Sequence, residues 1–127
     1  MRLKVFTPTG VVFDREVAGI VAEGSNGHFG LRPRHIDFVS DLVPGLLRLQ
    51  MELPNGDEEY IAVDRGLLIK QGDDVLVSVH DAVGEAPLEE LMEIVNSRFA
   101  TLNDKERAVH SALARLEADF LRRFMDL

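Results

Sequence analysis

The chain has 127 residues, of which 46% are hydrophobic and 28% charged, and it contains no cysteine. These values are typical of a globular protein with one medium or two small domains, argue against disorder, and exclude disulfides and thiolate metal sites. The net charge of -8 argues against nucleic acid as a partner, because binding to phosphates depends on lysine and arginine. No apolar run reaches the roughly 20 residues that span a bilayer. We therefore expect a cytoplasmic chain that contacts a membrane only through a partner.

Composition divides the chain near residue 84. All ten glycines and four of the five prolines lie in residues 1–84, with twelve of the fourteen valines. Residues 85–127 are instead rich in leucine, alanine, glutamate and arginine. Because valine favours strands and the other group favours helices, we predict a β domain over 1–84 followed by a helical domain over 85–127.

The first part predicts a series of short strands separated by turns. Clear examples are residues 3–6, 11–13, 16–23, 46–53, 59–63, 67–70 and 75–79. Odd-numbered residues from Leu47 to Leu53 are apolar and the residues between them are polar, which indicates a half-buried strand. Asn55-Gly56 then predicts a tight hairpin to the next strand. Strands at this spacing predict an antiparallel β-sandwich or a flattened barrel.

The second part predicts an antiparallel two-helix hairpin. Pro87 suits the first position of a helix, since its missing N–H is not needed there. One apolar stripe then contains Leu88, Leu91, Met92, Val95, Phe99 and Leu102. The stripe of the second helix contains Val109, Ala112, Leu113, Leu116, Phe120 and Phe124. Asn103 and Glu106 match a capping pattern at the start of this second helix, and the short link makes the two helices antiparallel neighbours.

Residue patterns for catalysis are absent from the sequence. The four histidines include no pair four residues apart on a helix. A metal site would need His28, His35 and a carboxylate. The alternative is that these are loop histidines that make ordinary hydrogen bonds. Gly24, Gly27 and Gly30 lack the spacing of a phosphate-binding loop and favour a turn with positive φ angles. We therefore expect no enzyme activity in the chain alone, no cofactor and no metal.

Several local motifs carry a family resemblance. The run Glu23–His35 contains the pattern G-S-x-G-x-x-G-[IL]-x-P-x-H, and Leu42-Val43-Pro44-Gly45 follows it. With Ala62–Leu68 and Asp73–Val79, this order resembles the epsilon subunit of F-type ATP synthases over nearly the whole chain. The run Arg32–Val39 resembles an alternate, sodium-associated branch of these ATPases.

The resemblance implies a non-catalytic subunit of the rotor stalk. In that family the sandwich docks on the gamma subunit and rests on the ring of c subunits. The helical hairpin either folds down on the sandwich or extends into the alpha/beta catalytic head, where it restrains ATP hydrolysis. The expected partners are therefore gamma, the c-ring and the alpha/beta head, at the cytoplasmic face of the plasma membrane, where the chain is peripheral.

The resemblance also implies roles for individual residues. The loop Ser25, Asn26, Gly27 and His28 occupies the place that faces the c-ring. Many relatives have an acidic residue where this chain has His28, so their ion pair with the ring does not carry over to this chain. The hypothesis in its place is that a partly protonated His28 meets a carboxylate of the ring. Gly30, Pro33 and His35 are expected to structure the loop, with His35 buried.

The resemblance also implies a role for arginines in the second predicted helix. Arg115, Arg122 and Arg123 either reach an acidic stretch of the head or form a solvated face. Some relatives bind ATP through an [IL]-D-x-x-R-A motif, but here the aligned run is Leu88–Glu93, with Met92 at the arginine position. ATP binding is therefore not expected.

A second function from a different class remains an alternative. The chain would then be a stand-alone β-module that binds a small ligand, with the hairpin as an interaction element. Such a module needs a pocket where polar groups converge, which the apolar strand faces do not indicate.

Overall fold

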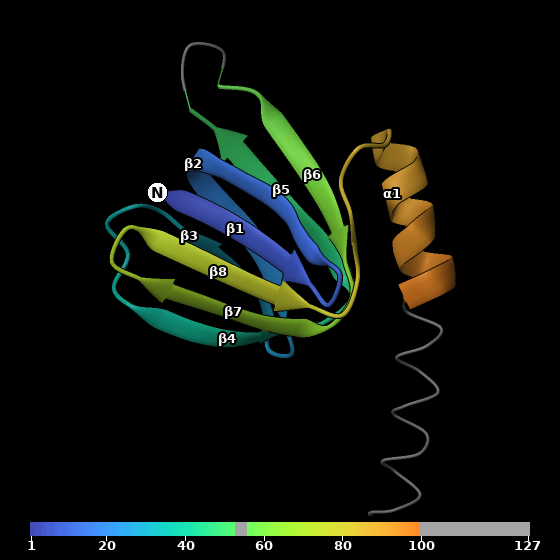
Figure 1. The fold of residues 1–127 in the computed structure, drawn as a ribbon, viewed down its shortest axis with the longest axis horizontal. Helices are drawn as coiled ribbons and strands as arrows, with labels where there is room; N and C mark the ends of the chain where they lie inside the picture. The colour runs from blue at the N-terminus through green and yellow to red at the C-terminus, as the bar shows by residue number, and fades with distance from the viewer. Residues whose placement is uncertain (53–55, 100–127) are drawn as a thin grey trace, which may run out of the picture.

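The computed structural model describes residues 1–52 and 56–99. Within these residues nine strands form the body, and a helical segment packs beside them (Figure 1). The strands are β1 (Arg2–Thr7), β2 (Gly10–Gly24), β3 (Gly27–Leu31), β4 (Phe38–Leu42), β5 (Gly45–Met51), β6 (Glu58–Val63), β7 (Gly66–Gln71), β8 (Asp74–Val79) and β9 (Ala82–Val83). The helical segment comprises α1 (Leu88–Ile94) and a π-helical turn, Val95–Phe99.

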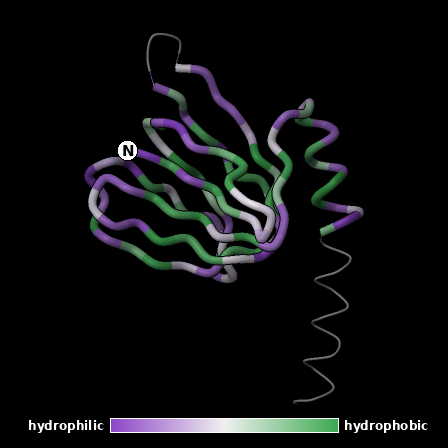
Figure 2. Tube along the Cα trace, viewed as in Figure 1, coloured by the Kyte–Doolittle hydropathy of each residue, from purple (hydrophilic) through white to green (hydrophobic). Residues whose placement is uncertain are grey.

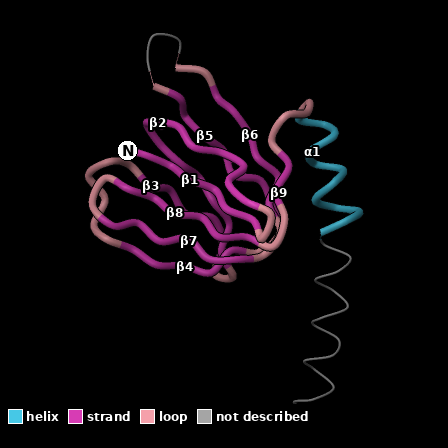
Figure 3. The backbone as a smooth tube through the Cα atoms, in the orientation of Figure 1, coloured by secondary structure: helices cyan, strands magenta, loops and turns pink. Residues whose placement is uncertain are grey.

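Two sheets share the long strand β2 (Figure 3). The first sheet holds β4, β7, β8, β1 and the beginning of β2. The second sheet holds the end of β2 with β3, β5, β6 and β9. Paired strands run antiparallel, as predicted, except that β1 and β8 are parallel. The strand order in the described residues ends at β4 and at β9, so the sheets form an open sandwich and not a closed barrel.

Strand β2 corrects one detail of the prediction. The sequence predicts two strands separated at Asp14 and Arg15, but β2 runs unbroken through both. Arg2 on β1 donates a hydrogen bond to Asp14 at 2.6 Å, and Arg15 donates one to Glu59 on β6, so both polar residues have partners on other strands. An irregularity after Val17 lets the strand pass from one sheet into the other.

The core lies between the sheets and follows the predicted alternation. In β5, Leu47, Leu49 and Met51 are buried and the residues between them are not, which confirms the period of two. Strand β8 behaves in the same way, with its valines buried. Hydrophobic and hydrophilic segments therefore alternate along the strands, as Figure 2 shows. Strands β5 and β6 pair as the predicted hairpin.

Lys70 is a buried cation in this core, only 2% exposed. Its Nζ donates hydrogen bonds to the backbone carbonyls of His35 and Gly72, each at 2.6 Å. The backbone N–H of Gly72 in turn donates to Asp37 at 2.8 Å. These bonds tie the loop between β3 and β4 to the turn between β7 and β8.

Helix α1 begins one residue later than predicted. Pro87 has ψ 151° and is the N-cap, and its carbonyl accepts the hydrogen bond from the Leu91 N–H. The helix lies against β5, β6 and β9 of the second sheet. Its contact cluster consists of buried Ala62, Leu91 and Phe99 with partly buried Leu46, Tyr60, Val83, Ala86, Ile94 and Val95.

The predicted apolar stripe of this helix splits in two. Leu91 and Phe99 are each 1% exposed, whereas Leu88 is 36% and Met92 48% exposed. The π-helical turn that starts at Val95 explains the split, because its i→i+5 bonding underwinds the helix and turns Phe99 to the side of Leu91. The second predicted helix falls in residues 100–127, outside the described residues.

Candidate functional site

The predicted c-ring-facing loop is the tip of the β2–β3 hairpin. Ser25 and Asn26 form the turn, while Gly27 and His28 already belong to β3. Gly27 has φ 115°, a conformation that favours glycine. All four residues of this predicted loop are exposed. Of the three glycines expected in a positive-φ turn, only Gly27 has one, because the other two lie in extended strands.

Strand β4 supports this hairpin tip. A Cβ on Gly24 would lie 2.9 Å from Ser40 Oγ and 3.0 Å from the Asp41 carbonyl oxygen, so the two strands approach too closely for a side chain there. The Ser25 N–H points at the Asp41 carboxylate, 3.3 Å from Oδ2. Sequence reasoning missed Asp41, since the two residues are 16 positions apart and no local pattern joins them.

His28 has a carboxylate close by in this chain. Its Nε2 lies 3.6 Å from Glu23 Oε2, and the two residues are cross-strand partners in the β2–β3 register. His28 is 69% exposed and Glu23 37%. Glu23 in turn approaches β5, where a Cβ on Gly45 would lie 2.9 Å from Oε2. A carboxylate of another subunit would therefore compete with Glu23 for the imidazole.

His35 lies in the loop beyond the other end of β3. We expected His35 to be buried, but it is only half-buried. Its Nδ1 lies 2.8 Å from the Ile36 carbonyl oxygen. Its ring meets Phe38 edge-on at 5.5 Å, and Phe38 packs on Phe29 at 5.2 Å. With the bond that its carbonyl accepts from Lys70, these contacts fix the loop.

The two histidines do not form the alternative metal site. His28 starts β3 and His35 follows its end, so the strand separates them. Among residues 1–52 and 56–99, no group of three or more His, Asp or Glu side chains is placed to hold a metal ion.

Gly30 and Pro33 contribute to the surface of this region. Pro33 is exposed in the loop. Gly30 pairs with Val21, and a Cβ there would be no closer than 3.9 Å to another atom, so neither space nor backbone angle demands glycine. An open groove of about 610 Å³ runs over Gly19 and Gly30 on the second sheet.

Basic and acidic side chains border this groove. Arg48 lines it and donates a hydrogen bond at 2.5 Å to Glu58, which also accepts one from the Tyr60 hydroxyl at 3.0 Å. These bonds lower the pKa of the Glu58 carboxyl, and the bond to Glu58 raises the pKa of Tyr60. The Arg48 charge is therefore largely satisfied within the chain.

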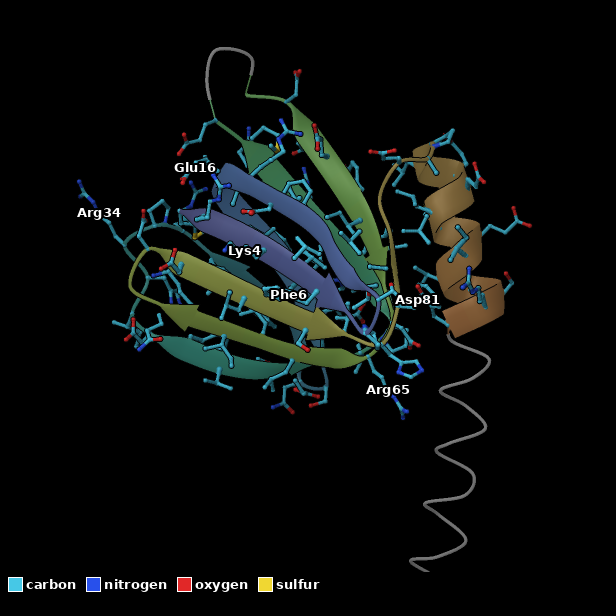
Figure 4. All side chains as sticks on the ribbon, in the orientation of Figure 1. Lys4, Phe6, Glu16, Arg34, Arg65 and Asp81 are labelled. Carbon is cyan, nitrogen blue, oxygen red and sulfur yellow. The ribbon has the colours of Figure 1, made fainter. Side chains whose placement is uncertain are left out.

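The outer face of the first sheet carries a patch of apolar residues where solvent-facing strands are usually polar. Val39, Ile69 and Leu76 are adjacent across β4, β7 and β8, and Leu67 lies beside them. Val39 is 62% exposed and Leu76 41%. We call these four residues the apolar face. Lys4 and Phe6 project from the neighbouring strand β1 in Figure 4.

Two further predictions concern the helical part. Met92, at the arginine position of the ATP motif, is exposed on α1. Arg115, Arg122 and Arg123 lie outside the described residues. No helix in the part of the chain that the structure describes is long and apolar enough to cross a membrane.

Comparison with known proteins identifies the family. The family model "ATP synthase, Delta/Epsilon chain, beta-sandwich domain" matches residues 1–85. The chain belongs to this family. Its relatives are epsilon chains of ATP synthases, as the sequence resemblance predicted.

Relatives of this epsilon chain match along most of its length. The ATP synthase epsilon chain of Persephonella marina is 33% identical over 106 residues, 82% of this chain and 76% of that one. The epsilon chain of Wolinella succinogenes is 30% identical over 93% of this chain and 92% of its own length.

A solved structure shares the fold. A chain of the Euglena gracilis mitochondrial ATP synthase, in a structure described as OSCP/F1/c-ring, has a TM-score of 0.61 and 23% identity. The match covers 72% of this chain and 58% of that one.

Proposed function

We propose that this epsilon chain is a non-catalytic rotor subunit that couples ion flow through the c-ring to ATP synthesis or hydrolysis in the alpha/beta head. The family match over residues 1–85 carries the proposal, because it spans every strand of the sandwich. A rotor also needs a stiff body. The continuous core between the sheets supplies one, since strands joined by many long-range contacts open only with the whole fold.

The apolar face is the surface that we assign to gamma. Large exposed apolar patches on soluble proteins usually mark contacts with other proteins. Val39, Leu67 and Leu76 supply such a patch on one side of the sandwich, away from the helix on the second sheet.

The tip of the β2–β3 hairpin is the surface that we assign to the c-ring. Ser25, Asn26 and His28 are exposed there, and the support from Asp41 holds the tip in place. We propose that His28, with Glu23 beside it, meets polar groups of the ring. Pro33 and His35 act behind the tip, where they shape the loop that follows β3, and Gly30 lies in the strand that leads to this loop.

Residues 85–127 form the regulatory domain in this proposal. Its described beginning, α1, rests on the second sheet. We propose that this domain leaves the sandwich to restrain ATP hydrolysis, with Arg115, Arg122 and Arg123 as contacts to the head and without ATP as a ligand. The subunit then works at the cytoplasmic face of the plasma membrane, held there by the complex.

A pull-down from native membranes tests the assignment. Tagged chain is expected to recover gamma, alpha, beta and the c-ring. Leu76→Asp is expected to lose them, because it places a charge on the apolar face. Val21→Asp is the matched control, since Val21 is 39% exposed against 41% for Leu76 but lies on the other sheet.

The outcomes distinguish an error in the stalk role from an error in the surface assigned to gamma. Recovery of none of these subunits by the unaltered chain would refute the stalk role and favour the ligand-binding module, with the groove over Gly19 and Gly30 as its site. Full recovery by Leu76→Asp would refute only the gamma face. Circular dichroism checks that both variants fold.

A further inference from the structure

The end of the helical segment is joined to the sandwich by an ion pair. Arg98 donates a hydrogen bond to Asp81 Oδ2 at 2.5 Å across 17 positions of sequence. Asp81 lies between β8 and β9, at the end of the sandwich beside the far end of the helix (Figure 4). The covalent link, residues 84–87, enters the helix before Leu88. The described part of the helical segment, residues 88–99, is thus held at two places, once by the chain and once by this pair.

Two hydrogen bonds within the sandwich hold Asp81 in place independently of Arg98. Its Oδ1 accepts a hydrogen bond from the Ala82 N–H at 2.9 Å, and its carbonyl accepts one from the Asp64 N–H at 2.9 Å. Oδ2 remains for Arg98. An acceptor already held by the sandwich loses little freedom when the pair forms, so more of the interaction is available to hold the helix.

The π-helical turn brings the arginine to this acceptor. Underwinding after Val95 places Phe99 in the apolar contact, and the Arg98 guanidinium lies 5.6 Å from the centre of the Phe99 ring. Ser97 Oγ donates to the Glu93 carbonyl at 2.7 Å, a bond that often accompanies distorted helices. The last turn therefore combines one buried aromatic ring with one surface ion pair.

We propose that Asp81 and Arg98 form a clasp that sets how long α1 stays on the sandwich and so regulates release of the C-terminal domain. The regulatory consequence rests on the proposed function, whereas the clasp itself does not. The apolar contact of α1 is small, with Ala62, Leu91 and Phe99 as its buried members. Loss of a modest ion pair therefore changes the docked population measurably.

Hydrogen exchange on the isolated full chain tests the clasp. Asp81→Asn keeps an oxygen for the Ala82 N–H and removes the charge, and Arg98→Gln removes the partner. Each is expected to speed exchange of the α1 amides about two- to fivefold, the range for exposed ion pairs, while amides of the sandwich stay unchanged. Arg98→Lys is expected to restore most of the protection. Added salt is expected to speed exchange in the unaltered chain but not in Asp81→Asn.

Asp14→Asn is the matched control, because Asp14 accepts a comparable bond from Arg2 at 2.6 Å on the first sheet. Equal α1 exchange in the unaltered chain and Asp81→Asn would overturn the clasp, as would an equal effect of Asp14→Asn. ATP hydrolysis by the reassembled complex is then measured with Asp81→Asn. A changed rate supports regulation through the clasp. Faster exchange with an unchanged rate keeps the clasp as a structural contact and refutes its role in regulating release of the C-terminal domain.

Discussion

The sandwich and α1 are held by very different amounts of buried surface. The core between the sheets takes residues from β1 to β8 and is continuous. The contact under α1 buries Ala62, Leu91 and Phe99 completely and adds partly buried neighbours. Since a fully buried large apolar side chain contributes about 1.5–3 kcal/mol, the helix is attached far more weakly than the strands are joined.

This difference suits a subunit with one stiff part and one movable part. Because most helical stability in proteins comes from tertiary packing, the order of α1 depends on its docking. Detaching it exposes little of the main core. The comparison predicts that mutations in the sandwich lower global stability, whereas mutations under α1 change only the local protection of the helix.

Gly66→Ala is expected to have the largest effect, because it breaks the stiff part. A Cβ there would lie 2.0 Å from the Ser78 carbonyl oxygen and 2.7 Å from Val79 Cα, so the β7–β8 register must shift. We expect a loss of about 3 kcal/mol or more in the free energy of unfolding, measured in urea. Gly19→Ala is the control: its Cβ would be 3.6 Å from the nearest atom, and stability should stay the same or rise by up to about 1 kcal/mol. Equal losses in both would refute the steric argument.

Phe99→Ala is expected to detach the movable part. Truncation of a fully buried phenylalanine costs about 3–5 kcal/mol, which is comparable with the whole apolar contact of α1. Exchange of the α1 amides should approach that of an undocked helix, while the urea midpoint of the sandwich is unaltered. Met92→Ala changes an exposed residue of the same helix and should leave both unchanged. A drop in the sandwich midpoint with Phe99→Ala would contradict the separation of the two parts.

Lys70→Met sharpens the comparison by testing a polar contact inside the sandwich. The carbonyls of His35 and Gly72 lose their donor, so we expect a loss of about 1–3 kcal/mol in the free energy of unfolding. Exchange in the loop between β3 and β4 should rise with it. Lys4→Met, on the outer face of β1, should change stability by less than about 0.5 kcal/mol. A stable loop in Lys70→Met would show that the aromatic contacts of Phe38 and the bond from Gly72 to Asp37 hold it without Lys70.

Local sequence patterns were sufficient where the contacts are local. The β5–β6 hairpin followed from alternation between Leu47 and Leu53 and from the turn signal after it. The glycine pattern in Glu23–His35 likewise located the turn after the end of β2, although the strands β3 and β4 that follow it were not predicted. In both cases the residues that decide the structure are neighbours in the chain, so periodicity and turn chemistry carry the information.

Contacts between distant residues were not predictable in this way. The parallel pairing of β1 with β8 joins Leu3 to Val75, and only the closing of the whole sandwich brings them together. The same holds for Asp41 under the hairpin tip and for Asp81 beside Arg98. The π-helical turn was also missed, because the spacing of the apolar residues fits an ordinary α-helix. Only the contact with the second sheet, which buries Phe99, distinguishes the two.

The smallest expected effect concerns exposed ion pairs on the sandwich, which contrast with the clasp on α1. Hydrogen bonds from Arg2 and Arg48 lower the pKa values of the Asp14 and Glu58 carboxyls in the folded protein. A lowered folded pKa gives stability that is present above the unfolded value, near 4, and is lost as the pH falls through the folded value. Arg2→Gln should therefore return the Asp14 titration, followed by carboxyl NMR, toward its ordinary pKa, with little change in stability at pH 7. An unchanged Asp14 titration would mean that the pair is broken in solution.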